Sequence, residues 1–510
     1  MKKVLIILLA VFTITGVWAQ DFGFGFDDDA GETASANTPI SAKISGEVSA
    51  QLLGFVHDFS SEEKAKSASL GDMVSGALNF SASGANVDAF IGLDLSAASL
   101  SELATGIDSP SSTPLILNEA YLRSYLGPVT IEAGYRKLIW GRADSFGPLD
   151  VINPVDYTDL TVIDDVQSIK IARPLVHLTW NTGSFSKIEG VFIPNFAGHR
   201  FDQKDRWIPA QYSTMRTVIE NEIYKQLTPM MEQIPSQNIP IVREMFSQIS
   251  GNFSTFSPDL PNMTKLEHFQ TGIRFTTTIG PADFGLQYFY GNLFQPDLTI
   301  TGVDDFISDL VEKNMPILGS TSVNLDDIYP GDISKISPQI KYNRYHQIGV
   351  DYAQVLFGFN VRAEFAVHLT EDLKGDNGSV RNPFLGWSFG FDRDLFWGIN
   401  ANIQCNETIR LFNDKVGKNP LLDCEADADM TSTRITMQLS KRFLRDELET
   451  KVAAIWDVEN EDCYIIPAIV WNIKDCTAEL SAGILTGNEK GGLGQYWENS
   501  FVKLALSYSF

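Results

Sequence analysis

Residues 501–510 alternate strictly between apolar side chains and small or polar ones. One face of this pattern carries Val502, Leu504, Leu506, Tyr508 and Phe510. The other face carries Lys503, Ala505, Ser507 and Ser509. A tilted strand of about ten residues is long enough to cross a bilayer. The alternation therefore predicts a β-strand with one apolar face, either in a membrane or at the edge of a soluble sandwich.

The same alternation recurs along the chain, most clearly in residues 87–95, 269–279, 359–369 and 434–440. The polar faces of these segments carry Arg, Glu, Asp, Gln and small residues. After residue 20 we find no further apolar run of about 20 residues, so a polytopic helical membrane protein is excluded. The formal charge of −25 excludes nucleic-acid binding through a broad basic face.

Connections between the expected strands alternate between short and long. Short turns are predicted at Gly127-Pro128, Gly280-Pro281 and Arg445-Asp446, among others. Outer-membrane barrels combine short periplasmic turns with long external loops. We therefore predict an all-β fold, a transmembrane antiparallel β-barrel of about 18 strands (16 to 18), with both termini in the periplasm. The predicted long loops, some with short helices, are 57–73, 97–116, 141–167, 197–264, 293–343, 371–383, 412–430 and 486–500.

The N-terminus has the composition of a secretory signal. Lys2 and Lys3 precede an apolar run, and Ala19 stands at the expected cleavage point. We expect a signal peptide over 1–19, a periplasmic tail over 20–42, and the barrel over 43–510 with large insertions at 197–264 and 293–343. This organisation predicts export through the inner membrane and residence in the outer membrane.

Four cysteines fall in the last quarter of the chain, without a C-x-x-C pair that would indicate a zinc or redox site. A disulfide between Cys405 and Cys424 is one possibility for stapling a loop, and the sequence leaves it open. Cys463 and Cys476 would lie at opposite ends of a hairpin, beyond disulfide reach. We interpret these two as free thiols facing apolar surroundings.

Charged and imidazole side chains fall on the polar faces of the expected strands. Opposed charges in a pore rank solutes by charge and dipole. The alternative is that the charges pair with one another and stiffen a hydrated barrel. The candidates for lining the lumen are Glu119, Arg123, Glu132, Arg136, Arg274, Arg362, Glu364, His368 and Arg434.

Residues 134–141 and 150–156 form the most distinctive segment. The segment resembles uncharacterised bacterial porin-like barrels related to alginate-export barrels, in which G-R-x-x-x-W-G precedes D-x-x-N-P-x-D. Here Tyr135 separates the glycine from the arginine. We favour a loop folded into the barrel mouth, with a turn at Asn153-Pro154 and Trp140 in an interfacial girdle. The motif residues are Trp140, Gly141, Asp150, Asn153, Pro154 and Asp156.

The terminal strand ending on Phe510 resembles the C-terminal signal of bacterial outer-membrane barrels. That resemblance implies the barrel-assembly machinery as a partner, beside the lipid of the outer membrane. A small-molecule solute, whose identity the sequence does not specify, is the third expected partner.

Residues 213–234 have helical apolar spacing. The helix could close the mouth as a gate, form an apolar funnel, or pack on neighbouring loops. We favour packing and expect the packed helix to constrict the entrance. The apolar face carries Met215, Val218, Ile219, Ile223, Leu227 and Met230.

No hydrolase, metalloprotease or phosphate-binding motif is present, and the six His lack metal-ligand spacing. We therefore expect no enzyme activity, metal or cofactor. The sequence favours a porin-like channel that passes small solutes passively through a loop-constricted polar lumen. The alternatives are a channel for hydrophobic or amphipathic compounds and a surface adhesin that presents long loops.

Overall fold

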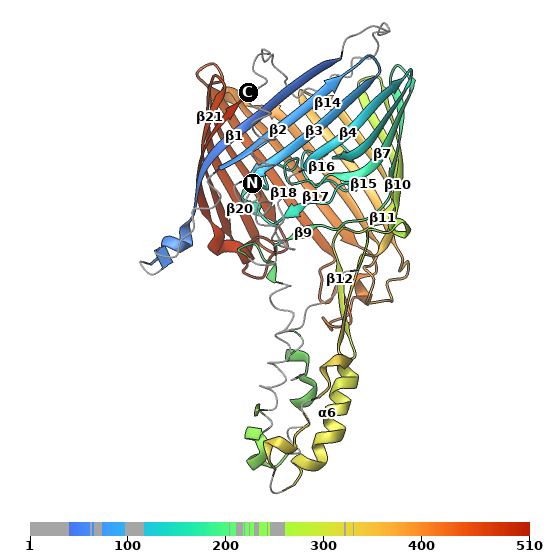
Figure 1. The fold of residues 1–510 in the computed structure, drawn as a ribbon, viewed down its shortest axis with the longest axis vertical. Coiled ribbons are helices and arrows are strands. Elements are labelled where there is room, and N and C mark those ends of the chain that lie inside the picture. Colours follow the sequence, from blue (N-terminus) through green and yellow to red (C-terminus); the bar gives the residue numbers. More distant parts are fainter. Residues whose placement is uncertain are drawn as a thin grey trace, which may run out of the picture.

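The computed structural model shows a closed β-barrel with a slender projection at one end (Figure 1). The expected signal peptide (1–19) and most of the expected tail (20–42) lie outside the described residues. The structure describes residues 40–61, 64–65, 74–96, 117–202, 205–210, 218, 220–223, 225–228, 234–241, 243–244, 261–320, 323–329 and 331–510.

A single sheet of 18 strands forms the barrel, which confirms the predicted fold class. Its first half comprises β1 (Ser41–Phe55), β2 (Val74–Ser83), β3 (Val87–Ser96), β4 (Leu117–Leu126), β5 (Val129–Arg136), β7 (Arg173–Gly183), β8 (Ser186–Ile193), β10 (Gln270–Ile279) and β11 (Ala282–Asn292). Its second half comprises β14 (Arg344–Leu356), β15 (Phe359–Thr370), β16 (Phe384–Asp394), β17 (Ile399–Arg410), β18 (Thr431–Phe443), β19 (Leu448–Asp457), β20 (Asp462–Ile473), β21 (Cys476–Thr486) and β22 (Phe501–Ser509).

Each barrel strand pairs antiparallel with its neighbours in the chain, and β22 pairs with β1 to close the sheet. The closing register sets Glu47 opposite Ser509 and Phe55 opposite Phe501. Closure leaves no free edge, which a sheet in lipid requires because its backbone groups must all be paired.

The apolar faces predicted from period two lie on the outside of the barrel. Leu504, Leu506 and Tyr508 on β22 are each about half exposed, as are Ile273 on β10 and Val350 on β14. Their neighbours in sequence point inward, and many of these inward residues are buried polar side chains. An apolar exterior around a polar interior is the arrangement of a transmembrane barrel.

The two ends of the barrel differ in their connections. At the end where both described termini lie, short hairpin turns join the strands (Figure 1). At the other end almost every connection is long, as predicted. Among the described residues, no helix is long and apolar enough to span a membrane.

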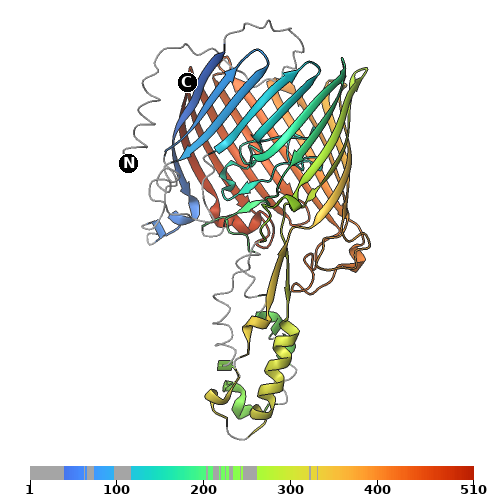
Figure 2. The same ribbon diagram turned by 45° about the vertical axis from the view of Figure 1, so that its right-hand side comes forward.

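A projection extends from the long-loop end, away from the barrel (Figure 2). Its base is a two-stranded ribbon of β12 (Asp297–Thr301) and β13 (Ser337–Lys341), and α6 (Val303–Leu318) lies beyond it. The other short elements of the chain are β6 (Asp156–Tyr157), β9 (Arg200–Phe201), η1 (Val56–Phe59), η2 (Leu160–Val162), η3 (Ser236–Asn238), η5 (Leu266–His268), η6 (Leu325–Asp327), η7 (Ile333–Lys335), η8 (Phe396–Gly398), η9 (Asn413–Lys415) and η10 (Gly494–Asn499).

Candidate functional site in the lumen

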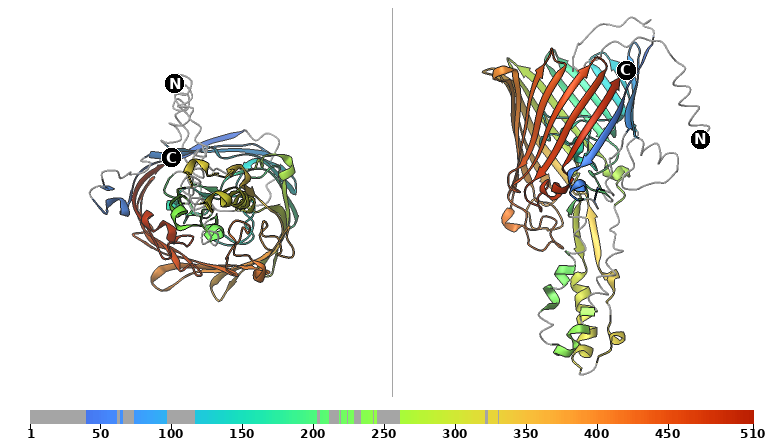
Figure 3. Two further views of the ribbon diagram at one scale, coloured as in Figure 1. Left: turned by 90° about the horizontal axis from the view of Figure 1, so that it is seen from below. Right: turned by 90° about the vertical axis from the view of Figure 1, so that its left-hand side faces the viewer.

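Residues 137–172, between β5 and β7, fold into the barrel rather than over its rim (Figure 3). We call this stretch the inner segment. It begins where β5 ends at Arg136, and the Glu119 carboxylate of β4 accepts a 2.7 Å hydrogen bond from the Lys137 N–H. The segment then crosses to the wall formed by β11 and β14–β18, where its next contacts lie.

One buried carboxylate fastens the inner segment to this far wall. Glu364 of β15 accepts backbone N–H hydrogen bonds from Arg142, from Ala143 at 2.7 Å and from Leu149 at 3.3 Å. Hydrogen bonds to a charged acceptor contribute about 1.5–3 kcal/mol each. A single side chain thus fixes both ends of the turn 142–149.

Close approach at Glu364 depends on two glycines of the inner segment. A Cβ at Gly141 or at Gly147 would collide with a Glu364 carboxylate oxygen. Gly141 also has φ +100°, a conformation that other residues rarely adopt. These two positions therefore allow the backbone to wrap around the carboxylate.

Glycines of the barrel wall make matching room. A Cβ at Gly386 would lie 2.8 Å from the Pro148 Cβ, and one at Gly349 would collide with Leu149. Beside them, Gln347 donates to the Pro148 carbonyl at 2.6 Å and Gln287 donates to the Leu149 carbonyl at 3.0 Å. The wall therefore satisfies the polar backbone of the turn as well as accommodating it.

Ion pairs add a second set of attachments between the inner segment and the wall. The Arg142 guanidinium contacts Asp351 of β14 at 2.7 Å and Asp283 of β11 at 3.3 Å. Arg274 of β10 contacts the other oxygen of Asp351 at 2.8 Å. On the opposite flank, Asp144 of the inner segment pairs with Arg362 of β15 at 2.6 Å.

The motif residues stabilise the segment itself. The Asn153 amide donates to the carbonyls of Arg136 and Ile171, and its oxygen accepts from the Leu138 N–H at 2.7 Å. Asp150 pairs with Lys170. Asp156 accepts from the Thr158 N–H and hydroxyl. The side chain of Asn153 thus joins the two ends of the inner segment.

The prediction that Trp140 belongs to an interfacial girdle is wrong. Its side chain is 1% exposed and packs inside the barrel with Leu138, Ile152 and Phe289. The strand ends at Arg136, so the alternation of outward and inward side chains along β5 does not extend to Trp140. An indole that enters the lumen is stabilised by burial against this apolar cluster.

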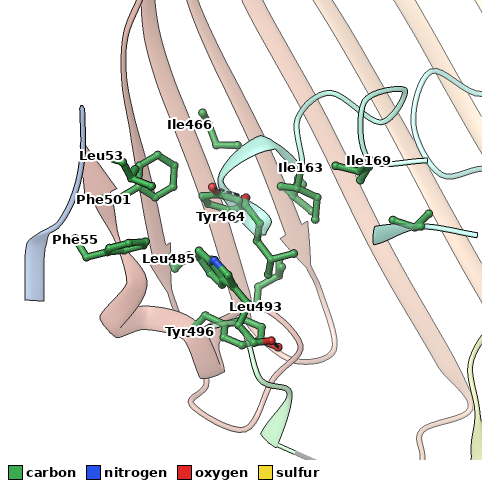
Figure 4. Close-up of a cluster of buried hydrophobic side chains, with 14 residues drawn as sticks. Leu53, Phe55, Ile163, Ile169, Tyr464, Ile466, Leu485, Leu493, Tyr496 and Phe501 are labelled. Atoms are coloured by element: carbon green, nitrogen blue, oxygen red, sulfur yellow. Dashed lines mark hydrogen bonds between the residues drawn. The ribbon is translucent and has the colours of Figure 1, made fainter. Parts of the chain in front are cut away.

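The returning half of the inner segment packs on a different part of the wall (Figure 4). Ile163 and Ile169 join a cluster with Tyr464 of β20 and Phe501 of β22. The Tyr464 hydroxyl donates to the Leu160 carbonyl at 3.0 Å. The inner segment therefore spans the lumen and is held at both walls.

A histidine of the long loop also supports the returning half. His199 accepts a 2.9 Å hydrogen bond from the Val155 N–H through Nδ1. Burial lowers the pKa of His199 to about 4, so the ring stays neutral near pH 7 and keeps this acceptor. Beside it, the short parallel pair of β6 and β9 connects Asp156 and Arg200.

The other predicted lumen residues also lie on the inner face, and they form separate groups. Glu132 of β5 pairs with Arg123 at 2.6 Å and with Arg136, and its second oxygen lies 2.7 Å from His177 Nδ1. Arg434 of β18 lies 3.8 Å from Asp457. The charges are therefore largely paired, which is the alternative that the sequence left open.

His368 forms a different kind of contact. Its ring is buried between Phe384 at 4.2 Å and Tyr345 at 5.5 Å, with ring planes within 11° and 17° of parallel. The side chain therefore packs behind the inner segment and does not line an open path.

The inner segment divides the lumen into a sealed wall and an open wall. We define the sealed wall as β10, β11 and β14–β17, where many inward side chains are buried, among them Gln270, Gln287, Gln347, Ser388 and Gln404. We define the open wall as β1–β4, β18 and β19, where inward polar side chains remain partly exposed, among them Asn79, Ser81, Arg123 and Gln438. The returning half of the inner segment contacts this wall at Lys451, which pairs with Asp164 at 3.6 Å. Exposed polar surface inside the barrel is therefore concentrated on the open wall.

The predicted gate helix has a different location. Of its apolar residues, Met215, Ile219 and Met230 lie outside the described part of the chain. Ile223 and Leu227 are buried in the projection against Phe306 and Leu310 of α6, and Val218 packs against the same cluster. Packing on neighbouring loops is thus confirmed for these three, but the expected constriction at this helix is wrong, because the inner segment is what narrows the lumen.

All four cysteines are free thiols. Cys405 lies on β17 opposite Phe389 and Ile435, on the lipid-facing side, whereas Cys424 belongs to the loop after β17. This separation explains why the possible Cys405–Cys424 bridge is not formed. Within the described ranges, no group of three or more His, Cys, Asp or Glu is placed to hold a metal ion.

Sequence reasoning missed the partners that hold the inner segment. The predicted site residues do not include Asp351, Gln347, Gln287 and Gln404, nor the glycines Gly349 and Gly386. Inward-facing glycines opposite a long loop were the available signal, because a strand interior disfavours glycine unless another backbone approaches.

The fold and the lumen together define a transmembrane β-barrel that is narrowed by its own chain. No family model matches the sequence, and no curated protein matches it. Among solved structures, OccAB4 of Acinetobacter baumannii is 8% identical with a TM-score of 0.42, covering 92% of this chain and 98% of that one. A BenF-like porin from Pseudomonas fluorescens Pf-5 is 8% identical with a TM-score of 0.43, at 92% and 98% coverage.

The outer membrane protein opdK of Pseudomonas aeruginosa is 8% identical with a TM-score of 0.42, covering 92% of this chain and 99% of that one. At these values the assignment of the barrel rests on the strand pairings of this chain. Those pairings place it in an outer membrane, where single-chain antiparallel barrels with an even number of strands occur.

Proposed function

We propose that the protein is a passive outer-membrane channel for small polar solutes, narrowed by the inner segment. The observation that carries this proposal is the asymmetry of the lumen. Glu364, Arg142 and Asp144 hold the inner segment on the sealed wall, while the inward side chains of the open wall stay partly exposed. A barrel of this size encloses an aqueous channel unless it is plugged.

The charges along the open wall support selection of solutes by charge. Asp88 and Arg123 lie on β3 and β4, and Arg434 and Lys451 lie on β18 and β19. Rings and rows of fixed charges in a pore impose electrostatic barriers that favour some solutes over others. The proposed site residues are the predicted lumen set without His368, together with Arg142, Asp144 and Asp351.

Three parts of the proposal rest on sequence alone. Residues 1–19 act as the export signal, and 20–42 as a periplasmic tail. The strand ending on Phe510 is recognised by the barrel-assembly machinery. The relation to porin-like and alginate-export barrels rests on the motif at 134–156. The channel needs no energy source and performs no chemistry on its solute.

Conductance of the purified protein in planar bilayers tests the proposal. Wild-type protein should give steady ohmic currents. Glu364→Ala removes the acceptor of three backbone N–H groups, so the inner segment should loosen and the currents should become larger and noisier. Leaving buried donors unsatisfied costs about 1–3 kcal/mol each.

Glu47→Ala is the matched control. Glu47 is an exposed carboxylate on β1, and the strand register directs its side chain into the lumen. Its currents should keep the wild-type noise. A wild-type protein that is electrically silent, and stays silent in Glu364→Ala, would exclude the channel.

A further inference from the structure

A cationic and aromatic cluster lies on the outer surface of the barrel, at the long-loop end of β10, β11 and β14. His346 accepts or donates a 2.8 Å hydrogen bond with the Tyr288 hydroxyl through Nδ1, and its ring lies 4.9 Å from that of Tyr290. The Arg344 guanidinium lies 4.9 Å from the Tyr290 ring. We call the cluster the rim patch, and its members are Lys265, His268, Phe269, Tyr288, Tyr290, Arg344 and His346.

The rim patch faces the membrane, not the lumen. One step toward the barrel centre, the same faces of β10, β11 and β14 carry Ile273, Leu286 and Ile348, which are 54%, 52% and 49% exposed. From mid-membrane outward, the surface thus changes from aliphatic to aromatic and then to cationic. That order matches the transition from acyl chains to lipid headgroups.

The cations are held in place. Arg344 donates to the backbone carbonyls of Glu267 and, at 2.6 Å, of Phe269. The Glu267 carboxylate lies 3.4 Å from Lys265 and 3.6 Å from His268. Lys265 remains 65% exposed. The Glu267 carboxylate therefore pairs with one of the two permanent cations and one of the two imidazoles of the rim patch, in a protein whose net charge is −25.

We propose that the rim patch binds the phosphorylated headgroup of an outer-leaflet lipid. Lys265 and Arg344 offer charge to a phosphate, and charge-assisted hydrogen bonds of this kind are the strong ones. The acyl chains of the same molecule would lie along Ile273, Leu286 and Ile348. The assignment to the outer leaflet rests on the proposed orientation of the barrel, in which the long loops face the cell exterior. It does not depend on whether the barrel conducts.

Lipid retention by the full-length protein in detergent tests this proposal. Native mass spectrometry should show wild-type protein retaining bisphosphorylated lipid A about tenfold better than the same lipid without phosphates. The double variant Lys265→Gln/Arg344→Gln should lose most of this preference, because it removes both cations that are proposed to face the phosphate. Equimolar inorganic phosphate should not displace the lipid, because the acyl chains contribute to binding.

Lys441→Gln is the matched control. Lys441 also lies beside an aromatic ring, 4.9 Å from that of Phe443, but at the short-turn end of the barrel. This variant should keep the wild-type preference. Heat-modifiable electrophoretic mobility verifies that each variant is folded.

Equal retention of the phosphorylated and dephosphorylated lipids would overturn the proposal. So would an unchanged preference in the folded double variant, or displacement by inorganic phosphate, which would indicate a free-anion site. A silent channel with intact lipid preference would remove the proposed function and leave the rim patch standing.

Discussion

Two long insertions leave the same end of this barrel and fold in opposite directions. The inner segment, 137–172, enters the lumen and is fixed by wall residues such as Glu364 and Asp351. The projection, built on β12, β13 and α6, extends away, and α6 packs with Ile223 and Leu227 of the 197–264 insertion around an apolar cluster centred on Phe306 and Leu310. The comparison shows that the inner segment depends on partners in the barrel wall, whereas the projection depends on apolar side chains from neighbouring insertions.

Polar contacts at the base of the projection attach it to neighbouring loops of the barrel. Arg381 pairs with the buried Asp297 at the start of β12, and Asn343 donates to the same carboxylate at 2.7 Å. The Ile300 N–H donates to the Leu421 carbonyl of a neighbouring loop at 2.6 Å. These contacts join the projection to the loops after β15 and β17, outside the lumen.

Replacing each insertion in turn with a linker should show which of the two limits the channel conductance, and this is the largest effect that we expect. Replacing 138–171 with a short Gly-Ser linker removes the lumen obstruction, so single-channel conductance should rise several-fold. Replacing 302–336 in the same way should leave the conductance near the wild-type value. A large rise in the second variant, or none in the first, would reverse the assignment.

Truncating the core of the projection should affect that region alone. Phe306→Ala removes a side chain that is 1% exposed, and such a change costs about 3–5 kcal/mol. Hydrogen exchange should show α6 losing protection while the barrel strands keep theirs. Ser308→Ala, on the exposed face of the same helix, is the control and should leave the exchange unchanged. Loss of barrel protection in Phe306→Ala would mean that the two regions fold as one.

Acid should weaken the projection slightly through Asp309. Hydrogen bonds from Lys313 and Tyr329 lower the pKa of Asp309 from 3.8 to about 2. A lowered carboxyl pKa gives stabilisation that is present above the ordinary value and is lost as pH falls toward the folded value. Hydrogen exchange in α6, corrected for intrinsic rates, should therefore become faster as the pH falls from the ordinary pKa of an aspartate to the lowered pKa of Asp309. The Asp309→Asn variant should not show this pH dependence.

The strands were predictable because period two directly reflects the two faces of a sheet. That signal located the outward Leu504 and the inward Glu364, but it ended with the strand, and Trp140 was therefore misplaced. The apolar face at Ile223 and Leu227 was predicted too, whereas its packing against α6 was not. A pattern shows that a face is buried, and the element that covers it depends on tertiary contacts.

The role of Glu364 illustrates the same limit within the lumen. Alternation placed it inward, yet its three backbone donors come from residues more than 200 positions earlier in the chain. The cue available in sequence was the set of inward glycines, because Gly349 and Gly386 leave space that only a nearby chain would use.

Thiol accessibility in the lumen tests the division into sealed and open walls most directly. In a background without the four native cysteines, the variants Gln438→Cys on β18 and Ser388→Cys on β16 would be exposed to a membrane-impermeant thiol reagent during current recording. Gln438 is exposed and Ser388 is 3% exposed, and both lie inward by strand register. We predict rapid modification and current block in the Gln438→Cys variant, and no reaction in the Ser388→Cys variant until 138–171 is replaced. Equal reaction of both variants with the inner segment intact would contradict its fixed position.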